Sequence, residues 1–263
     1  MVTIDLSGKI AIVTGAGQGL GQCTATVLHA AGANVVINFF DDPSGGNRRR
    51  AEETAARLGE RAVAIAADVR DGAQIRQMFA VAEERFGQVN IVVNNAGATK
   101  RGEFVELTEE DWADGFALKF FGAVRVTRAA WPHLRESHGS VIHISGIGGR
   151  TPGAQFAIGG SVNAALLSFT KALAEMGLRD GVQVNCISPG TIRTERYSKR
   201  LETMAREQGI AMNEAEAAFV KAQRVSRIGE PSEIAGMVAY LVTEGRFLHG
   251  SIIDIDGGAT KTV

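Results

Sequence analysis

Cysteine, tryptophan and tyrosine are scarce in this sequence, with two residues of each among 263. Cys23 and Cys186 fall on an expected helix and an expected strand, so two buried thiols are a better interpretation than a disulfide. The small number of cysteines excludes a small secreted domain held together by disulfides. The two tyrosines, Tyr197 and Tyr240, both lie in the last third of the chain.

Excess charge and long apolar runs are also missing. The formal net charge of −1 gives no reason to expect nucleic acid or an anionic membrane as partner. No apolar run approaches membrane-spanning length, and the N-terminal MVTIDLSGK has no signal-peptide core. We therefore expect a cytoplasmic globular protein without a membrane or nucleic-acid partner, built as a single domain over residues 1–263.

A glycine-rich stretch, Thr14–Gly21 (TGAGQGLG), stands between an expected strand at Lys9–Val13 and an expected helix at Cys23–Ala31. Glycines let backbone N–H groups come close to a pyrophosphate, and the helix N-terminus adds partial positive charge. A strand, a glycine turn and a helix in this order predict a dinucleotide-binding turn rather than a chance run of glycines.

Strands and helices alternate along the rest of the chain, which predicts parallel βαβ units. The expected fold is a single Rossmann-type α/β domain, a doubly wound parallel sheet of about seven strands with helices on both faces. Its expected strands are Lys9–Val13, Asn34–Phe39, Ala62–Ala66, Asn90–Val93, Ser140–Ser145, Val182–Ile187 and Ser251–Ile255. Its expected helices are Cys23–Ala31, Arg49–Leu58, Ala73–Phe86, Thr108–Leu134, Gln155–Met176 and Pro231–Val242.

The end of the second strand bears on the choice of nucleotide. NAD enzymes usually place an acid there to bind the ribose hydroxyls. Here that position is Phe39, and Asp41 and Asp42 come later. The missing acid removes a repulsion against a 2′-phosphate, and Arg48–Arg50 follows, although these arginines fit a solvated helix start equally well. The cofactor is therefore NADP(H) or NAD(H), with a modest preference for NADP(H).

Four motifs in the right order resemble the short-chain dehydrogenase/reductase family: T-G-x-x-x-G-x-G at Thr14–Gly21, N-N-A-G at Asn94–Gly97, P-G-x-I-x-T at Pro189–Thr194, and D-G-G at Asp256–Gly258. The resemblance implies that an Asp-Val pair contacts the adenine, and that residues 193–225 form a substrate lid. It also implies this set of cofactor-binding residues: Gly15, Gly17, Gln18, Gly19, Leu20, Phe39, Asp68, Val69, Asn94, Ala96, Gly97, Asn163, Pro189, Gly190, Ile192 and Thr194.

The resemblance fails at the catalytic positions. The family uses Ser, Tyr and Lys with a supporting Asn, and the Lys lowers the pKa of the Tyr. Aligning the helix that begins at Asn163 puts Asn163 at the Lys position, Gly159 at the Tyr position and Gly146 at the Ser position, with Lys119 replacing the Asn. No shift restores the pattern, because neither tyrosine precedes a lysine by four residues.

Four residues remain as catalytic candidates: Lys119, Ser145, Ser161 and Asn163. Lys119 and Asn163 look like an exchange of the family's Asn and Lys, so we expect Lys119 to enter the vacated cation site and Asn163 to bind the ribose hydroxyls. The alternative is that Lys119 extends to solvent. No His, Cys or carboxylate cluster has metal-ligand spacing, and His143 is expected to be a buried or subunit-contacting histidine.

Three functions stay open from the sequence. The first is an NAD(P)-dependent oxidoreductase that acts on a carbonyl or hydroxyl of a small substrate through an altered, tyrosine-less site. The second is a nucleotide-binding sensor or partner subunit without turnover, and the third is non-redox chemistry on the same fold. The apolar content of the two long helices predicts a homo-oligomer, a dimer or a tetramer.

Overall fold

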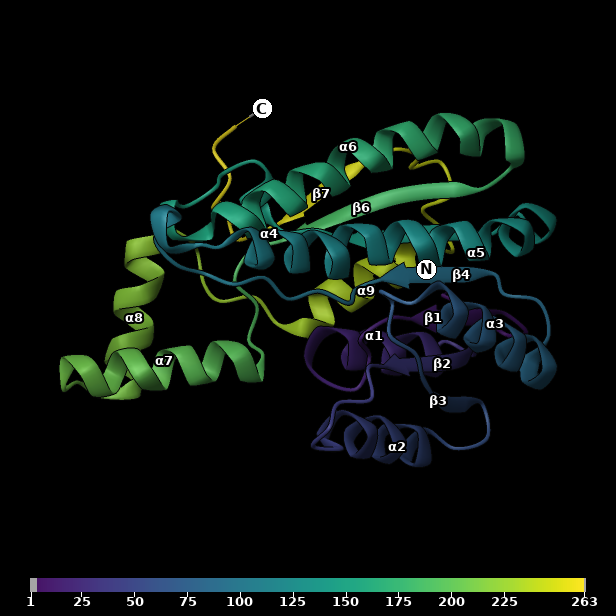
Figure 1. The fold of residues 1–263 in the computed structure, drawn as a ribbon, viewed down its shortest axis with the longest axis horizontal. Coiled ribbons are helices and arrows are strands. Elements are labelled where there is room, and N and C mark those ends of the chain that lie inside the picture. Colours follow the sequence, from purple (N-terminus) through teal and green to yellow (C-terminus); the bar gives the residue numbers. More distant parts are fainter. Residues whose placement is uncertain (1–3, 263) are drawn as a thin grey trace.

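The computed structural model describes residues 4–262, and its centre is one seven-stranded parallel sheet in the order β3-β2-β1-β4-β5-β6-β7 (Figure 1). The predicted fold class is confirmed. The order reverses between β1 and β4, where the chain crosses from one half of the sheet to the other. Its strands are β1 (Ile10–Val13), β2 (Asn34–Phe39), β3 (Ala62–Ala66), β4 (Ile91–Asn94), β5 (Ser140–Ile144), β6 (Gln183–Pro189) and β7 (Ile252–Ile255).

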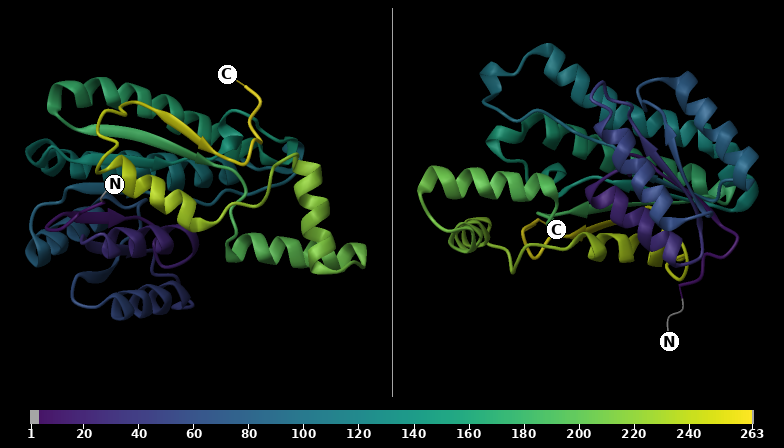
Figure 2. Two further views of the ribbon diagram at one scale, coloured as in Figure 1. Left: turned by 180° about the vertical axis from the view of Figure 1, so that it is seen from behind. Right: turned by 90° about the horizontal axis from the view of Figure 1, so that it is seen from below.

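Helices cover both faces of the sheet, as the expected βαβ pattern requires (Figure 2). One apolar core packs α1, α2 and α9 against the sheet, and a second packs α3, α5 and α6 against the opposite face. Every residue of β1 is buried, because a central parallel strand has a helix layer on each side. The helices are α1 (Gly19–Ala30), α2 (Gly46–Leu58), α3 (Gly72–Phe86), α4 (Glu109–Gly115), α5 (Phe121–Ser137), α6 (Ala157–Asp180), α7 (Glu195–Gln208), α8 (Met212–Gln223) and α9 (Pro231–Leu241).

The stretch predicted as one helix over Thr108–Leu134 is interrupted. It begins as expected, with Thr108 as N-cap in a capping box with Asp111. A π-helical turn, Phe116–Phe120, then separates α4 from α5. Such a turn places one extra residue in the helix and shifts the direction of the side chains that follow. Lys119 lies in this turn.

The segment predicted as a lid holds two helices, α7 and α8, which stand out from the body of the domain at the edge where the strands end (Figures 1 and 2). They enclose a separate small core in which Tyr197 packs against Phe219, with their ring centroids 5.6 Å apart. The sequence analysis named this segment without assigning helices to it. The chain therefore has a distinct two-helix arm beside the expected ligand edge.

One expectation about composition needs correction. The stretch Ala154–Asp180, which contains α6, is long and apolar enough to cross a membrane, with a mean hydropathy of 1.2 over its most apolar window. Length and composition alone are weak indications, because core helices pass the same test. Here α6 packs against β6 and the π-helical turn, yet only 39% of that window is buried.

Candidate active site

The glycine turn has the geometry that a phosphate-binding turn needs. Gly19 adopts a left-handed φ of +56°, where a side chain would be strained. At Gly21 an added Cβ would come within 2.5 Å of the Gly15 carbonyl oxygen, so only glycine lets helix α1 approach the turn this closely. The helix carries no side-chain cap at Gln18 and no acid in its first turn. Its N–H groups are thus left for an anion, which fits the pyrophosphate of a dinucleotide.

The second predicted turn is bound directly to the first. Asn95 Nδ2 donates to the carbonyl oxygens of Thr14 (2.9 Å) and Gly15 (3.2 Å). In return, the Thr14 hydroxyl accepts from the backbone N–H groups of Asn95 and Ala96, both at 3.0 Å. These bonds join the ends of β1 and β4 into one unit. Thr14 and Asn95 were not among the predicted site residues, although both belong to the motifs.

Asn94 and the residues that follow β6 make different contacts around the two joined turns. The buried side chain of Asn94 points into the protein, where Nδ2 donates to Thr127 Oγ1 at 2.9 Å. Gly190 N donates to the Ile255 carbonyl oxygen at 3.0 Å, which joins the turn after β6 to the end of β7. Thr194 lies near the glycine turn, with its Cγ2 3.7 Å from the place of a Cβ on Gly19. Ile192 packs over Gly229 beside Pro189 and Gly190, and is partly buried.

A hollow of about 670 Å³ lies along the glycine turn. Of the predicted cofactor residues, Gly17, Gln18, Gly19 and Thr194 line it. Arg50 and Arg57 of α2 line it as well. A larger hollow of about 820 Å³ lies between α7, α8 and the start of α9, and its lining includes none of the catalytic candidates. The larger space therefore belongs to the two-helix arm.

The end of β2 carries no exposed acid at the ribose position. Phe39 is buried, and the guanidinium of Arg48 lies 5.6 Å from the centre of its ring. Asp41 pairs with Arg48 at 2.5 Å. Asn38, one residue earlier, faces the other way and accepts from Gly15 N at 3.3 Å, so it supports the glycine turn. The position where NAD enzymes usually carry an acid is thus taken by Phe39, and Arg48 lies beside it.

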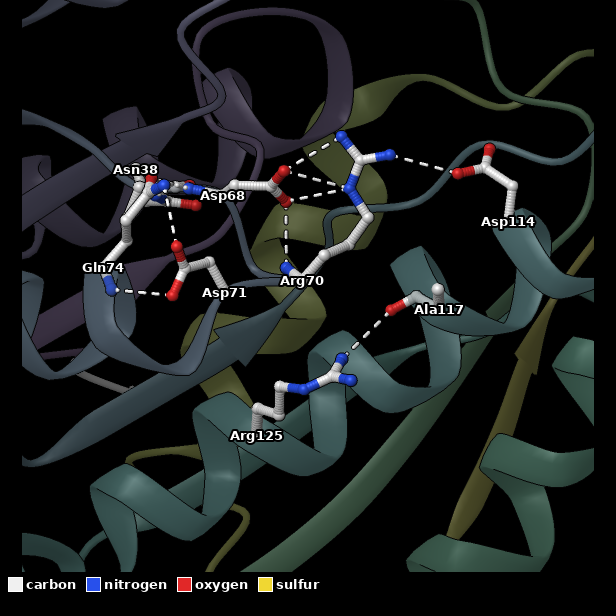
Figure 3. A network of polar contacts seen from close by, with 9 residues as sticks. Asn38, Asp68, Arg70, Asp71, Gln74, Asp114, Ala117 and Arg125 are labelled. Carbon is white, nitrogen blue, oxygen red and sulfur yellow. Dashed lines mark hydrogen bonds and ion pairs between the residues drawn. The ribbon is translucent and has the colours of Figure 1, made fainter.

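The two residues predicted to contact the adenine, Asp68 and Val69, have different surroundings. Asp68 forms a forked ion pair with Arg70, whose Nη1 also donates to Asp114 at 3.0 Å (Figure 3). This network joins the end of β3 to α4. Val69 is buried against Gly122 of α5, where an added Cβ would lie 2.7 Å from Val69 Cγ2. Asp68 therefore remains at the surface of the site, and Val69 is part of its support.

Lys119 and Asn163 meet, as the predicted exchange requires. Lys119 Nζ donates to Asn163 Oδ1 at 2.6 Å and to the Ser145 carbonyl oxygen at 2.8 Å. The lysine stem lies against Gly97 of the second turn, where an added Cβ would be 2.8 Å from Lys119 Cδ. The π-helical turn directs this side chain inward, so it does not extend to solvent as the alternative held. The ammonium is therefore placed at the joined ends of β4 and β5.

The surroundings of Lys119 change its acidity. Burial lowers the pKa of its ammonium to about 8; nearby Cys186 opposes this change, and Arg196 adds to it. No carboxylate pairs with Lys119 among residues 4–262. Although the ammonium lies deep among protein atoms, the residue as a whole is only partly buried. Near neutral pH such a group can both hold and release a proton.

A phenylalanine ring occupies the space beside Gly159, the glycine predicted to stand at the tyrosine position. An added Cβ on Gly159 would lie 2.1 Å from two ring carbons of Phe156, and one on Gly148 would lie 2.9 Å from the same ring. At Gly146, the predicted serine position, an added Cβ would be 3.0 Å from Asn163 Nδ2. Glycines at these places thus make room for Phe156 and Asn163.

Of the two serine candidates, Ser145 contacts Lys119 and Asn163, and Ser161 does not. Ser145 is buried, and its hydroxyl donates to the Asn163 carbonyl oxygen at 3.1 Å, while its own carbonyl holds Lys119. Ser161 is exposed on α6 and lines neither hollow. Ser145 therefore positions Lys119 and Asn163 through its backbone and hydroxyl, and Ser161 stands apart.

The position of His143 agrees with the sequence analysis. His143 is fully buried, accepts from Asn94 Nδ2 at 3.2 Å, and has a pKa lowered by burial to about 4. Both cysteines are free, Cys186 buried and Cys23 partly buried. Over the described residues no three His, Cys, Asp or Glu side chains gather as a metal site would need. The polar centre of the site is thus Lys119 with Asn163.

This chain is similar over nearly its whole length to a known protein family and to known proteins. The model of the family described as Enoyl-(Acyl carrier protein) reductase matches residues 15–260. An uncharacterized oxidoreductase of Methylorubrum extorquens is 34% identical over 254 residues, covering 96% of this chain and 98% of that protein.

Two solved structures are also similar. L-sorbose reductase from Gluconobacter frateurii, complexed with NADPH and L-sorbose, is 28% identical with a TM-score of 0.92, and each chain is covered fully. A short-chain oxidoreductase from Pseudomonas aeruginosa PAO1, described as containing an atypical catalytic center, is 27% identical with a TM-score of 0.90, over 98% of this chain and 100% of that one. With the sheet order, the joined turns and these matches, the chain belongs to the short-chain dehydrogenase/reductase family of oxidoreductases, whose cofactor is NAD(P)(H).

Proposed function

We propose that the protein is an NAD(P)(H)-dependent oxidoreductase that acts on a carbonyl or hydroxyl of a small substrate through a tyrosine-less site. In this site Lys119 supplies both the missing cation and the proton. The observation that carries the proposal is the 2.6 Å hydrogen bond from Lys119 Nζ to Asn163 Oδ1, at the place where the two nucleotide-binding turns join. An ammonium uses three donors, and two are taken by Asn163 and Ser145, so one remains for a ligand.

The positions of the two tyrosines support a site without a phenol. Tyr197 lies in the apolar core of the two-helix arm, and Tyr240 lies at the surface of α9. The space beside Gly159 is taken by the Phe156 ring, which has no proton to give. A lysine whose pKa is about 8 can do this work, because a proton donor acts best when its pKa is near the working pH.

The chemistry divides between the cofactor and the chain. A nicotinamide held along the glycine turn would supply the hydride for carbonyl reduction and would take it up in alcohol oxidation. Lys119 gives a proton to the carbonyl oxygen, becomes a neutral amine and regains a proton from solvent. Asn163 Oδ1 holds the ammonium in place, and Asn163 Nδ2 is left to donate to the ribose hydroxyls. In alcohol oxidation the neutral amine takes the hydroxyl proton.

Lys119→Met tests the proposal, with Lys9→Met, whose side chain is exposed just before β1, as the matched control. We measure nucleotide binding by fluorescence and turnover of a panel of ketones, aldehydes and alcohols by the absorbance of the reduced nicotinamide. Loss of the proton donor should lower turnover by about 10²–10⁴-fold. Loss of the cation should weaken nucleotide binding by about 1–3 kcal/mol.

Two results would count against the proposal. Lys119→Met with parental turnover and parental affinity would show that the Lys119–Asn163 pair has no functional role. A parent protein that binds nucleotide tightly but turns over nothing in the panel would favour the alternative of a sensor or partner subunit. The proposal includes a cytoplasmic location, which the two free thiols support.

A further inference from the structure

A second cation lies at the mouth of the site described above. The guanidinium carbon of Arg101 is 3.9 Å from the centre of the Phe156 ring. That ring also faces Gly148 and Gly159, next to Asn163. The backbone holds this arrangement, since Gly102 N donates to the Gln155 carbonyl oxygen at 3.2 Å. Arg101 is thus fixed over the ring that fills the tyrosine space.

Two further arginines lie on the two-helix arm, and their positive charges reach Arg101. Arg196 and Arg200 are four residues apart on α7, so they share one side of that helix. The guanidinium of Arg200 lies 5.2 Å from the ring centre of Phe219, which fixes its direction. Burial lowers the pKa of Arg101, and the positive charges of Arg200 and Arg196 lower it further. Arg196 has the same effect on the pKa of Lys119.

Acids close in sequence to Arg101 and Arg196 have other partners. Glu195 pairs with Lys199 at 2.6 Å, and Arg193 binds both Glu216 and Glu230. Glu103 accepts from Gln155 Nε2 at 2.9 Å. Among the described residues, Arg101, Arg196 and Arg200 form no ion pair. Arg101 therefore has no counter-ion among these residues.

We propose that Arg101 binds an oxyanion of the substrate, so that the substrate is a carbonyl or hydroxyl compound carrying a carboxylate or a phosphate. This inference rests on the proposed function, because it names the substrate class of the same site. A guanidinium offers paired donors that match a carboxylate or phosphate edge. Phe156 supports the flat face of Arg101 and leaves the guanidinium edge free for the anion. The reacting carbon then lies between this anchor and Lys119.

The test compares charged and neutral partners of the same ketone: a 2-keto acid against its methyl ester, and dihydroxyacetone phosphate against dihydroxyacetone. Each pair is measured with the parent, Arg101→Gln and the control Arg135→Gln, whose side chain is exposed at the far end of α5. The parent should prefer one charged partner by about 10–100-fold in kcat/KM. Arg101→Gln should remove that preference through KM and leave the neutral partner unchanged, while Arg135→Gln should behave as the parent.

The two pairs distinguish a carboxylate site from a phosphate site. Equal kcat/KM for charged and neutral partners, or an equal loss for both in Arg101→Gln, would overturn the inference. If no compound is turned over, the proposed function fails, and calorimetry with inorganic phosphate and acetate, with and without NADPH, still tests the anion site. Binding that weakens about tenfold or more in Arg101→Gln but not in Arg135→Gln supports the site. No binding to the parent refutes it.

Discussion

At the scale of single residues, the ammonium of Lys119 has an unusual position, because it is held by two oxygen acceptors and no carboxylate. Burial sets its pKa at about 8, so its charge changes within the range where enzymes are assayed. The lysine is protonated below this pH and neutral above it. The two directions of a redox reaction need opposite forms of the group.

This position predicts a pH dependence with a defined sign. If Lys119 gives the proton, carbonyl reduction should fall tenfold per pH unit above about 8, and alcohol oxidation should rise up to about 8. Initial rates from pH 6 to about 10 measure both limbs. In Lys119→Met, the change of rate near pH 8 should disappear for both reduction and oxidation. If Lys119→Met kept the same change of rate near pH 8, another group would be its cause.

His143 predicts a different pH effect, on stability. Burial lowers its pKa to about 4, below the 6.5 of an exposed histidine, so the unfolded chain binds a proton that the folded protein does not. The free energy of unfolding should therefore be unaffected above 6.5 and fall by up to about 3 kcal/mol as the pH drops from 6.5 to 4. Urea unfolding at several pH values measures this loss. In His143→Asn the loss should be smaller by that amount; an equal loss would exclude His143 as its cause.

At the scale of elements, the first turn of α6 and the loop before it pack closely, because a glycine in one leaves room for an aromatic ring of the other. Gly159 has no side chain, and the Phe156 ring takes the space. Gly159→Ala should destabilise the protein by about 1–3 kcal/mol, because the new methyl group collides with the ring. In the Phe156→Ala background the same change should be neutral or slightly stabilising, since alanine favours helices.

Thermal unfolding of this double-mutant cycle measures the coupling between the two positions. An equal cost of Gly159→Ala in both backgrounds would show that the ring does not occupy this space. Phe156→Ala alone should also lose stability, because it leaves a cavity, so the comparison is between backgrounds and not with the parent.

At the scale of the whole molecule, α6 is more apolar than its contacts within one chain require. Only 39% of its most apolar window is buried, and Phe121 on α5 and Leu178 on α6 are 46% and 75% exposed. Apolar surface of this kind is rarely left to water. We predict a homo-oligomer with α5 and α6 at its interface. Light scattering at micromolar concentration should return two or four times the mass of one chain, and the mass of a single chain would contradict this.

The nucleotide preference also belongs to this scale, because it depends on β2, α2 and the glycine turn together. Phe39 removes the acid that would repel a 2′-phosphate, and Arg48 stands over its ring. NADP(H) should bind at least as tightly as NAD(H) in fluorescence titrations. Arg48→Gln should weaken NADPH about tenfold and leave NADH unchanged. A clear preference of the parent for NADH would refute this prediction.

The sequence predicted the framework well because the signals that set it are local. The strands β2 and β3 match their predicted bounds, since short β-branched runs end at clear turn residues. The interruption between α4 and α5 was missed, because a π-helical turn keeps an apolar helical pattern and leaves no breaker residue. The helices α7 and α8 were missed because they pack mainly on each other.

The sequence by itself determined the fold class and the glycine turn, and it predicts the substitution of the catalytic positions, because these depend on residue types at fixed spacings. The tertiary structure alone decided that Lys119 turns inward to Asn163, that Phe156 fills the space beside Gly159, and that Arg101 lies over the Phe156 ring. Each of these joins segments distant in the chain, and no local pattern encodes the direction of a side chain across such a distance. The packing of helices on the sheet brings these groups together.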